Sequence, residues 1–200
     1  MPRYSQQTSR SFVILVLMAL AIVAFTSACS KGVGGSAVHL KSVNTGEKDI
    51  AVKSSHTFAV TKSFTDINSK ITTAASYRTY VANYELDAGN FSMTMDKPLA
   101  SDDQVRIVFS LVGEEGSNDK SPPKAGTYSA KADKYMKVED VTIVSRKGGS
   151  DARTTLDRST LSGEVKITSA SADSISGDID VTSGDSSLKG SFTARVLKRK

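Results

Sequence analysis

The sequence predicts an all-β protein, either an antiparallel β-sandwich or a partly open barrel, that ends in a three-stranded meander. Two observations lead to this prediction. From Tyr77 onward, short segments of alternating apolar and polar residues follow one another with turn residues between them. Near the C-terminus, one short pattern occurs three times at the spacing of strands joined by short loops. Evenly spaced short strands of this kind are typical of sandwiches and barrels.

The repeated pattern is apolar, x, Gly, x, apolar, x, apolar. It occurs at Leu161–Ile167, Ile175–Val181 and Leu188–Ala194, with spacings of 14 and 13 residues. A solenoid repeat needs a period of about 20 to 50 residues, so these copies are shorter than one solenoid unit. They match three neighbouring strands of a meander.

The glycine of each copy has the same parity as the apolar residues and therefore points to the same, buried face. We expect Ile167 to pair with Ile175, and Val181 with Leu188. In this register each glycine lies beside a large apolar side chain. Such a match in size would define the register and allow the sheet to coil tightly, so a structural purpose explains the glycines without a ligand.

The same register places carboxylates on the outer face of the meander, with Glu164 opposite Asp178 and Asp180 opposite Lys189. Like charges directly across a strand pair are destabilising, which makes Glu164, Asp178 and Asp180 candidate ligands of a cation such as Ca²⁺, or an acid/base pair. The alternative is a solvated face whose lysines neutralise the acids, and the pattern favours this alternative. We predict no cofactor.

Upstream of the meander, alternation predicts further strands. Tyr77–Leu86 and Phe91–Met95 are expected to form a hairpin about the turn at residues 87–90, and Val105–Leu111 and Val141–Val144 are expected to be strands. Between these last two segments lies a charged loop with two prolines, from Gly113 to Gly126.

Residues 37–75 are patterned more weakly. Alternation at residues 38–40 and 50–52, on either side of a turn at residues 44–46, indicates short strands. Phe64, Ile67 and Ile71 are spaced as on one face of a short helix. We therefore expect residues 37–200 to form one β-domain, most clearly patterned from residue 76 onward.

Residues 1–28 have the features of an export signal. Arg3 and Arg10 lie in a stretch without acidic residues and precede an apolar run of 14 residues, Phe12–Phe25. A helix needs about 20 apolar residues to cross a bilayer, so a permanent span is the weaker interpretation.

The segment that follows, Phe25-Thr-Ser-Ala-Cys29-Ser30, resembles the lipobox of bacterial lipoproteins, in which small residues precede a cysteine that receives a diacylglyceryl group. It departs from the family pattern at Thr26, where an aliphatic residue is usual. The resemblance implies cleavage after Ala28 and acylation of Cys29. The alternative is ordinary secretory cleavage at the same bond, because Thr26 and Ala28 also form a small-x-small site.

Cys29 is the single cysteine of the chain and has no partner for an internal disulfide. Two or more acyl chains anchor a protein stably, whereas one chain anchors it marginally. Residues 29–36 are rich in glycine and are expected to be a flexible tether. The resemblance also implies outer-membrane sorting in a diderm cell, because Ser30 is not aspartate, and the outer face of the cytoplasmic membrane in a monoderm.

Composition excludes some functions. Removing residues 1–28 leaves 24 basic and 21 acidic residues, a surplus too small and too scattered for a nucleic-acid-binding protein. His39 and His56 are the only histidines, and the sequence contains neither a His-Glu-x-x-His nor a Gly-x-Ser-x-Gly motif.

These observations predict a lipid-anchored protein of the cell envelope whose β-domain has a binding or structural role without catalysis. One alternative is an envelope hydrolase, or a calcium-binding module, that uses the surface carboxylates. Another is a component of a larger envelope assembly that contacts protein partners through the loop at residues 113–126 or through an exposed edge strand.

Overall fold

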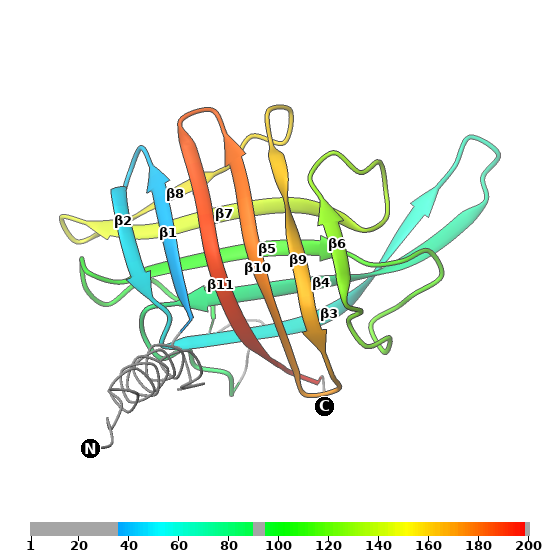
Figure 1. The fold of residues 1–200 in the computed structure, drawn as a ribbon, viewed down its shortest axis with the longest axis horizontal. Coiled ribbons are helices and arrows are strands. Elements are labelled where there is room, and N and C mark those ends of the chain that lie inside the picture. Colours follow the sequence, from blue (N-terminus) through cyan, green and yellow to red (C-terminus); the bar gives the residue numbers. More distant parts are fainter. Residues whose placement is uncertain (1–35, 90–94, 199–200) are drawn as a thin grey trace, which may run out of the picture. The chain divides into compact units, whose positions relative to one another are not determined.

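The computed structural model describes residues 36–89 and 95–198, and within these ranges the chain folds as eleven strands (Figure 1). The strands are β1 (Ala37–Ser42), β2 (Gly46–Ala51), β3 (Ser54–Thr65), β4 (Ile71–Ala82), β5 (Val105–Val112), β6 (Gly126–Ser129), β7 (Lys137–Lys147), β8 (Ser150–Thr155), β9 (Ser162–Ala170), β10 (Ser174–Ser183) and β11 (Ser186–Val196). The predicted all-β fold class is confirmed.

Eight of these strands pair in a closed ring, in the order β3, β4, β5, β7, β6, β9, β10, β11 and back to β3. The neighbours are antiparallel except at two joins, β6 with β7 and β11 with β3, which are parallel and short. Strands β1 and β2 extend the ring beside β11, and β8 extends it beside β7. The fold is therefore a mixed barrel flattened into two layers.

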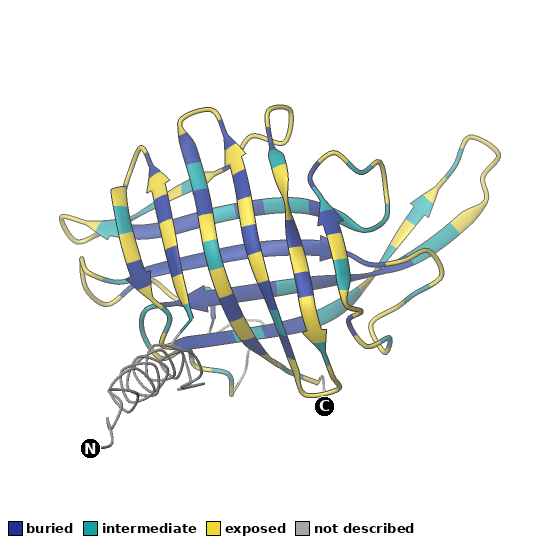
Figure 2. Ribbon diagram, in the orientation of Figure 1, coloured by how far each residue is buried: buried dark blue, intermediate teal, exposed yellow. Residues whose placement is uncertain are grey.

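Figure 1 shows the two layers crossing at a steep angle, with β1, β2, β6, β9, β10 and β11 in one layer and β3, β4, β5, β7 and β8 in the other. The main core lies between them. Along β10, buried and exposed residues alternate, as expected for a sheet with one face toward the core and the other toward solvent (Figure 2). All eight residues of β5 are buried, so this strand is covered on both faces.

The second cover of β5 comes from the segment between β4 and β5, residues 83–104, whose described parts pack on the outer face of the second layer. There a separate apolar cluster forms, with Phe58, Tyr80, Leu86, Met95 and Val108 among its members. The sequence alternation of Tyr80, Ala82 and Leu86 reflects this second cluster, because Tyr80 and Ala82 point away from the space between the layers.

The strands predicted from alternation are largely confirmed. The meander corresponds to β9, β10 and β11, the segment Val105–Leu111 lies within β5, and Val141–Val144 lies within the longer β7. The weakly patterned residues 37–75 belong to the sheet as β1, β2, β3 and the start of β4. Strand β8 was not predicted, because its sequence is polar and follows two glycines.

The helix predicted from Phe64, Ile67 and Ile71 is wrong. These residues lie at the tip of the β3–β4 hairpin, where the Asp66 carboxylate accepts hydrogen bonds from the backbone N–H groups of Asn68 and Lys70, at 2.8 and 2.9 Å. A side chain that satisfies the turn in this way favours a tight reversal over a helix. Ile67 is 99% exposed, so its apolar spacing does not mark a buried face.

The hairpin predicted between Tyr77–Leu86 and Phe91–Met95 lies partly outside the described residues, and its first strand ends earlier than predicted. Both edges of β4 are already occupied over residues 76–82, one by β3 and the other by β5. Strand β4 ends at Ala82, and residues 90–94 lie outside the described residues. Alternation located the strand correctly but could not identify its partners.

The register within the meander differs from the prediction on one side. Val181 pairs with Leu188 as expected, but Ile167 pairs with Gly177, two residues from its predicted partner Ile175. A one-residue bulge between Ser176 and Gly177 separates this register from that of the pairs nearer the turn. Each repeat glycine still lies beside a large apolar residue in the neighbouring strand, as Gly177 does between Ile167 and Phe192.

The stronger reason for these glycines is the close approach of the neighbouring backbone. A Cβ atom on Gly163, Gly177 or Gly190 would lie 2.1, 2.3 or 2.2 Å from a carbonyl oxygen of the adjacent strand. No side chain can be accommodated at such distances without moving a strand. The glycines therefore allow the first layer to coil tightly enough to close against the second.

Replacing Gly177 by alanine tests this explanation. Its φ angle is not in the left-handed region, so the cost comes from the backbone clash alone, and we expect a loss of about 3 kcal/mol in the free energy of unfolding. The measurement is urea unfolding followed by circular dichroism.

Gly184→Ala is the matched control, because Gly184 has a φ of +55° but open space around its Cβ position. That variant should lose only about 1 kcal/mol, the cost of a left-handed alanine. Equal losses in the two variants would contradict the proposed close approach.

Candidate functional site: an apolar cleft beside the β3–β11 join

The largest of the described cavities that has a mainly apolar wall is a cleft of about 490 Å³ beside the join between β3 and β11. We refer to it as the β3–β11 cleft. Its wall includes Phe58 from β3, Tyr77 from β4, Pro122 and Pro123 from the loop before β6, and Leu197 from the end of β11. Four segments that are distant in sequence therefore meet at one place.

The cleft exists because β11 and β3 separate after a very short contact. They pair only at Arg195 with His56 and at Val196 with Thr57, and the N–H of Leu197 donates to the Thr57 carbonyl at 2.7 Å. Strand β3 then continues to Thr65, while β11 ends at Val196. Beyond the join, the apolar surface of β3 has no strand of the first layer beside it.

The proline-containing loop is held at the mouth of the cleft by two buried tyrosines. The Tyr77 hydroxyl lies 3.2 Å from the carbonyl oxygen of Ser121 and 3.0 Å from that of Pro122, and it donates to this pair. The Tyr128 hydroxyl donates to the Lys124 carbonyl at 3.3 Å. Burial raises the pKa of both phenols, that of Tyr128 to about 12, so both remain neutral donors at ordinary pH.

The rim of the cleft is polar. Asp119 is connected to β3 twice, since its carboxylate accepts from the Thr61 hydroxyl and its N–H donates to the same oxygen, each at 3.0 Å. Lys198 forms an ion pair with Asp173 at 3.3 Å. Lys120 has no ion partner among the residues that the structure describes. An apolar interior with a cationic group at the rim suits an amphiphilic occupant.

The carboxylates predicted as candidate ligands lie elsewhere, on the exposed outer face of the meander. Their pairing differs from the prediction: Glu164 lies opposite Asp180, and Asp178 lies opposite Lys166. Asp180 also forms an ion pair with Lys189 at 2.8 Å. The expected pairing of Asp180 with Lys189 is confirmed, and that of Glu164 with Asp178 is wrong.

Within the described ranges, no group of three or more His, Cys, Asp or Glu residues is arranged to hold a metal ion. Glu164, Asp178 and Asp180 are each exposed and lie on a sheet face rather than in a cavity. The structure thus brings Glu164 and Asp180 together across one strand pair, with Lys189 beside them.

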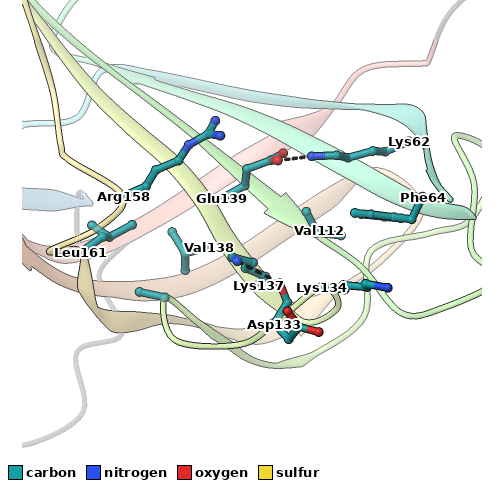
Figure 3. A pocket seen from close by; sticks show the side chains of 11 residues that line it. Lys62, Phe64, Val112, Asp133, Lys134, Lys137, Val138, Glu139, Arg158 and Leu161 are labelled. Carbon is teal, nitrogen blue, oxygen red and sulfur yellow. Dashed lines mark hydrogen bonds and ion pairs between the residues drawn. The ribbon is translucent and has the colours of Figure 1, made fainter. Parts of the chain in front are cut away.

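A smaller pocket of about 130 Å³ adjoins the outer part of β3 (Figure 3). Its charged groups are bonded within the protein: Lys62 forms an ion pair with Glu139, and the Lys137 ammonium donates to the Asp133 carbonyl at 2.9 Å. The first contact fastens β3 to β7, and the second fastens β7 to the loop that precedes it.

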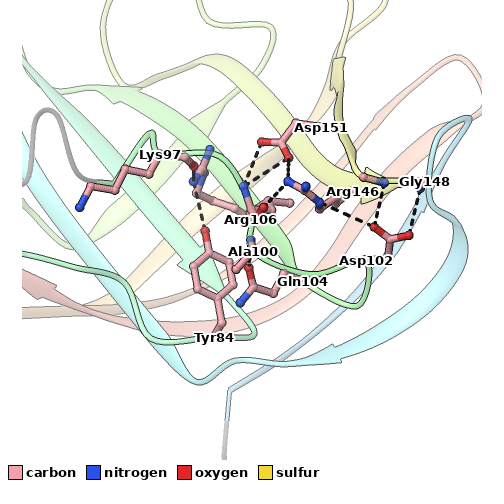
Figure 4. A network of polar contacts seen from close by, with 11 residues as sticks. Tyr84, Lys97, Ala100, Asp102, Gln104, Arg106, Arg146, Gly148 and Asp151 are labelled. Atoms are coloured by element: carbon pink, nitrogen blue, oxygen red, sulfur yellow. Dashed lines mark hydrogen bonds and ion pairs between the residues drawn. The ribbon is translucent and has the colours of Figure 1, made fainter.

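A polar network fastens the segment that covers the outer face of β5 (Figure 4). The Leu99 N–H donates to both oxygens of Asp151, at 3.2 and 3.1 Å, and Arg146 donates to the Leu99 carbonyl. Arg106, which is buried, donates to the Lys97 carbonyl at 2.8 Å. The network connects residues 97–104 to the β7–β8 hairpin and serves the fold.

The two histidines also lie apart from the cleft interior. His39 is exposed on β1, where Asp49 and Glu47 of β2 raise its pKa. His56 lies at the β3–β11 join, where burial and the neighbouring Arg195 lower its pKa and favour the neutral imidazole. Cys29, the predicted lipidation site, lies outside the described residues.

No helix capable of crossing a bilayer occurs among residues 36–89 and 95–198. Comparison with known proteins gives no match: no family model, no curated protein and no solved structure matches the chain.

The cleft itself was not predicted from the sequence. Its lining residues come from five separate segments, and none of these segments forms a local motif. The pair of prolines at residues 122–123 was not a specific signal either, because proline is common in exposed loops.

The buried tyrosines predict how stability depends on pH. In the unfolded chain their phenols ionise near pH 10, whereas burial raises the pKa of Tyr77 and Tyr128 in the fold. Their contribution to the free energy of unfolding is therefore complete below pH 10. It is lost as the pH rises toward 12, by up to about 1.4 kcal/mol per pH unit for each tyrosine, because the unfolded chain loses its phenolic protons first.

Urea unfolding of wild type and Tyr128→Phe between pH 8 and pH 12 measures this effect. Tyr128→Phe should show a shallower alkaline decline than wild type, because phenylalanine cannot ionise. An identical decline in both proteins would show that Tyr128 is not protected from ionisation in the fold.

Proposed function

We propose that this chain is a lipid-anchored protein of the bacterial cell envelope whose β-domain binds an apolar or amphiphilic group in the β3–β11 cleft, without catalysis. The observation that carries the binding role is the cleft itself. Its volume, about 490 Å³, lies within the range typical of ligand sites, which are mostly apolar with a few placed polar groups.

The chemistry of the wall supports binding rather than bond cleavage. Phe58, Pro122, Val196 and Leu197 provide contact area, and neither histidine nor cysteine is among the described lining residues. The Asp119 carboxylate, which a hydrolase would need free, is engaged by Thr61. Burying apolar surface in such a wall contributes roughly 25 cal/mol per Å².

The sequence of residues 1–36 supports the anchoring role. An export signal followed by a lone cysteine resembles a lipoprotein signal, and acylation of Cys29 would attach the domain to a membrane through residues 29–36. Eight fully extended residues reach at most about 28 Å, so the domain would work close to that surface. In a diderm cell this surface is the outer membrane, on its periplasmic or its external face.

A tryptophan placed at the cleft tests the binding role. The chain has no natural tryptophan, and Ala172 lies in the turn between β9 and β10 that lines the cleft. We expect the emission of Ala172→Trp to shift to the blue and to saturate on titration with lauric acid, because the alkyl chain removes water from the indole.

Thr193→Trp, on the exposed face of β11, is the control and should not respond. Adding Ala59→Phe to the Ala172→Trp variant should weaken binding by about tenfold, equivalent to about 1.4 kcal/mol, because the phenyl ring fills the cleft. An unsaturable signal, or the same signal from both tryptophan positions, would rule out a site in the cleft.

Mass spectrometry of the mature N-terminus tests the anchor. Wild type expressed in a bacterial host should begin at an acylated Cys29 and sediment with membranes, whereas Cys29→Ala should lack the acyl mass and leave the membrane fraction after cleavage. Recovery of a cleaved chain with an unmodified cysteine would overturn lipidation and favour ordinary secretion.

A further inference from the structure

The β3–β4 hairpin extends beyond the other strands of its layer, as the cyan hairpin in Figure 1 shows. We refer to residues 58–75 as the arm. Along the β4 edge of the arm, the outward backbone groups are satisfied by the protein's own loop. The Thr73 carbonyl accepts from the Gly116 N–H at 2.8 Å, and the Ala75 carbonyl accepts from the Gly113 N–H at 2.7 Å.

The β3 edge of the arm is different. The Thr57 carbonyl points outward, since it accepts from Leu197, and in an antiparallel pair outward residues alternate along the strand. The N–H and C=O groups of Ala59, Thr61 and Ser63 therefore also point outward. These three residues have no backbone hydrogen-bond partner on that edge in the described parts of the chain.

This open edge begins where β11 stops and adjoins the β3–β11 cleft, because Thr57, Phe58 and Ala59 line the cleft. At the other end of the arm, the tip exposes apolar side chains, with Ile67 99% and Ile71 67% exposed. Natural proteins usually cover, charge or shorten such an edge. Here a cleft at the base, an open backbone edge and an apolar tip form one continuous surface.

The charges along this surface indicate the chemistry of its partner. Lys62 and Lys198 are neutralised by ion pairs with Glu139 and Asp173, whereas Lys70 on the arm and Lys120 at the cleft rim have no ion partner among the described residues. The two carboxylates of this surface, Asp66 and Asp119, already accept hydrogen bonds from the protein itself. Complementary charge therefore means acidic residues on the partner. A second copy of the chain fits less well, because its own β3 edge at residues 59–65 contains a lysine and no acidic residue.

We propose that the occupant of the cleft is an extended, acidic segment of another polypeptide, which adds as a strand to the β3 edge at residues 59–65 and places one apolar side chain in the cleft. This inference rests on the proposed binding role of the cleft and specifies its partner. Backbone hydrogen bonds to Ala59, Thr61 and Ser63 provide affinity, and the cleft and lysines provide selectivity.

The test uses the full chain in lipid nanodiscs and a phage-displayed library of random ten-residue peptides. Selection should enrich peptides with an apolar residue and acidic residues at alternating positions. Binding of a synthetic selected peptide, followed by fluorescence anisotropy, should weaken at least tenfold in Ser63→Pro, which removes an outward N–H. Ser63→Ala retains this N–H and should bind within twofold of wild type.

Hydrogen exchange locates the bound peptide, since the amides of residues 59–65 should exchange more slowly in its presence. A second test leaves the protein unchanged: N-methylation along the peptide should weaken binding at every other residue, because alternate amides face β3. These results together would support strand addition even if Ser63→Pro fails to fold.

Other outcomes would overturn the inference in distinguishable ways. If lauric acid binds the cleft but no peptide is selected, or if selected peptides leave exchange at residues 59–65 unchanged, strand addition is wrong and the proposed cleft function stands. If the chain forms a dimer that Ser63→Pro dissociates, the occupant is a second copy. If neither lauric acid nor peptide binds, the proposed function fails as well.

Discussion

The ring of strands closes between β3 and β11 through two residue pairs, Arg195 with His56 and Val196 with Thr57. A full-length pairing would have sealed this corner, and its brevity leaves both the cleft and the open edge. The join is also where a cation and an imidazole meet. Burial and Arg195 lower the pKa of His56, so the imidazole at the join is neutral and does not repel the guanidinium.

The short join is tolerated because other contacts hold the two layers. The first layer coils tightly at the three repeat glycines, where neighbouring backbones approach too closely for any side chain. The second layer is covered on its outer face by the described parts of the segment between β4 and β5, residues 83–89 and 95–104, so that β5 is buried on both sides. Because these two features hold the layers away from the β3–β11 corner, that corner can carry a binding surface.

The parts of this architecture that depend on residues close together in the sequence could be predicted, and the parts that depend on distant contacts or on the exact register could not. The meander was predictable because alternation and turn spacing are local, and Val181 pairs with Leu188 across a short turn. The register of β9 against β10 was not, since its two-residue difference from the predicted register preserves every inward and outward position and leaves the alternation unchanged. The carboxylate pairing was wrong for the same reason.

The remaining errors have a common physical origin. The spacing of Phe64, Ile67 and Ile71 matched a helix, but the Asp66 turn and the long pairing with β4 determined the structure. The cleft depends on the contact between residues 56–57 and 195–196, which lie near opposite ends of the domain's sequence. No local pattern encodes such a contact.

The placement of the arm within the domain limits what it can reach. In Figure 1, β1 begins at one end of the described domain and the arm projects from the opposite side. At the tip of the arm, Ile67 and Ile71 are exposed, and no strand of the described residues pairs with β3 beyond Thr57 on the edge that faces away from β4. An open edge in that position is accessible to an extended polypeptide along its whole length, from the cleft to the tip.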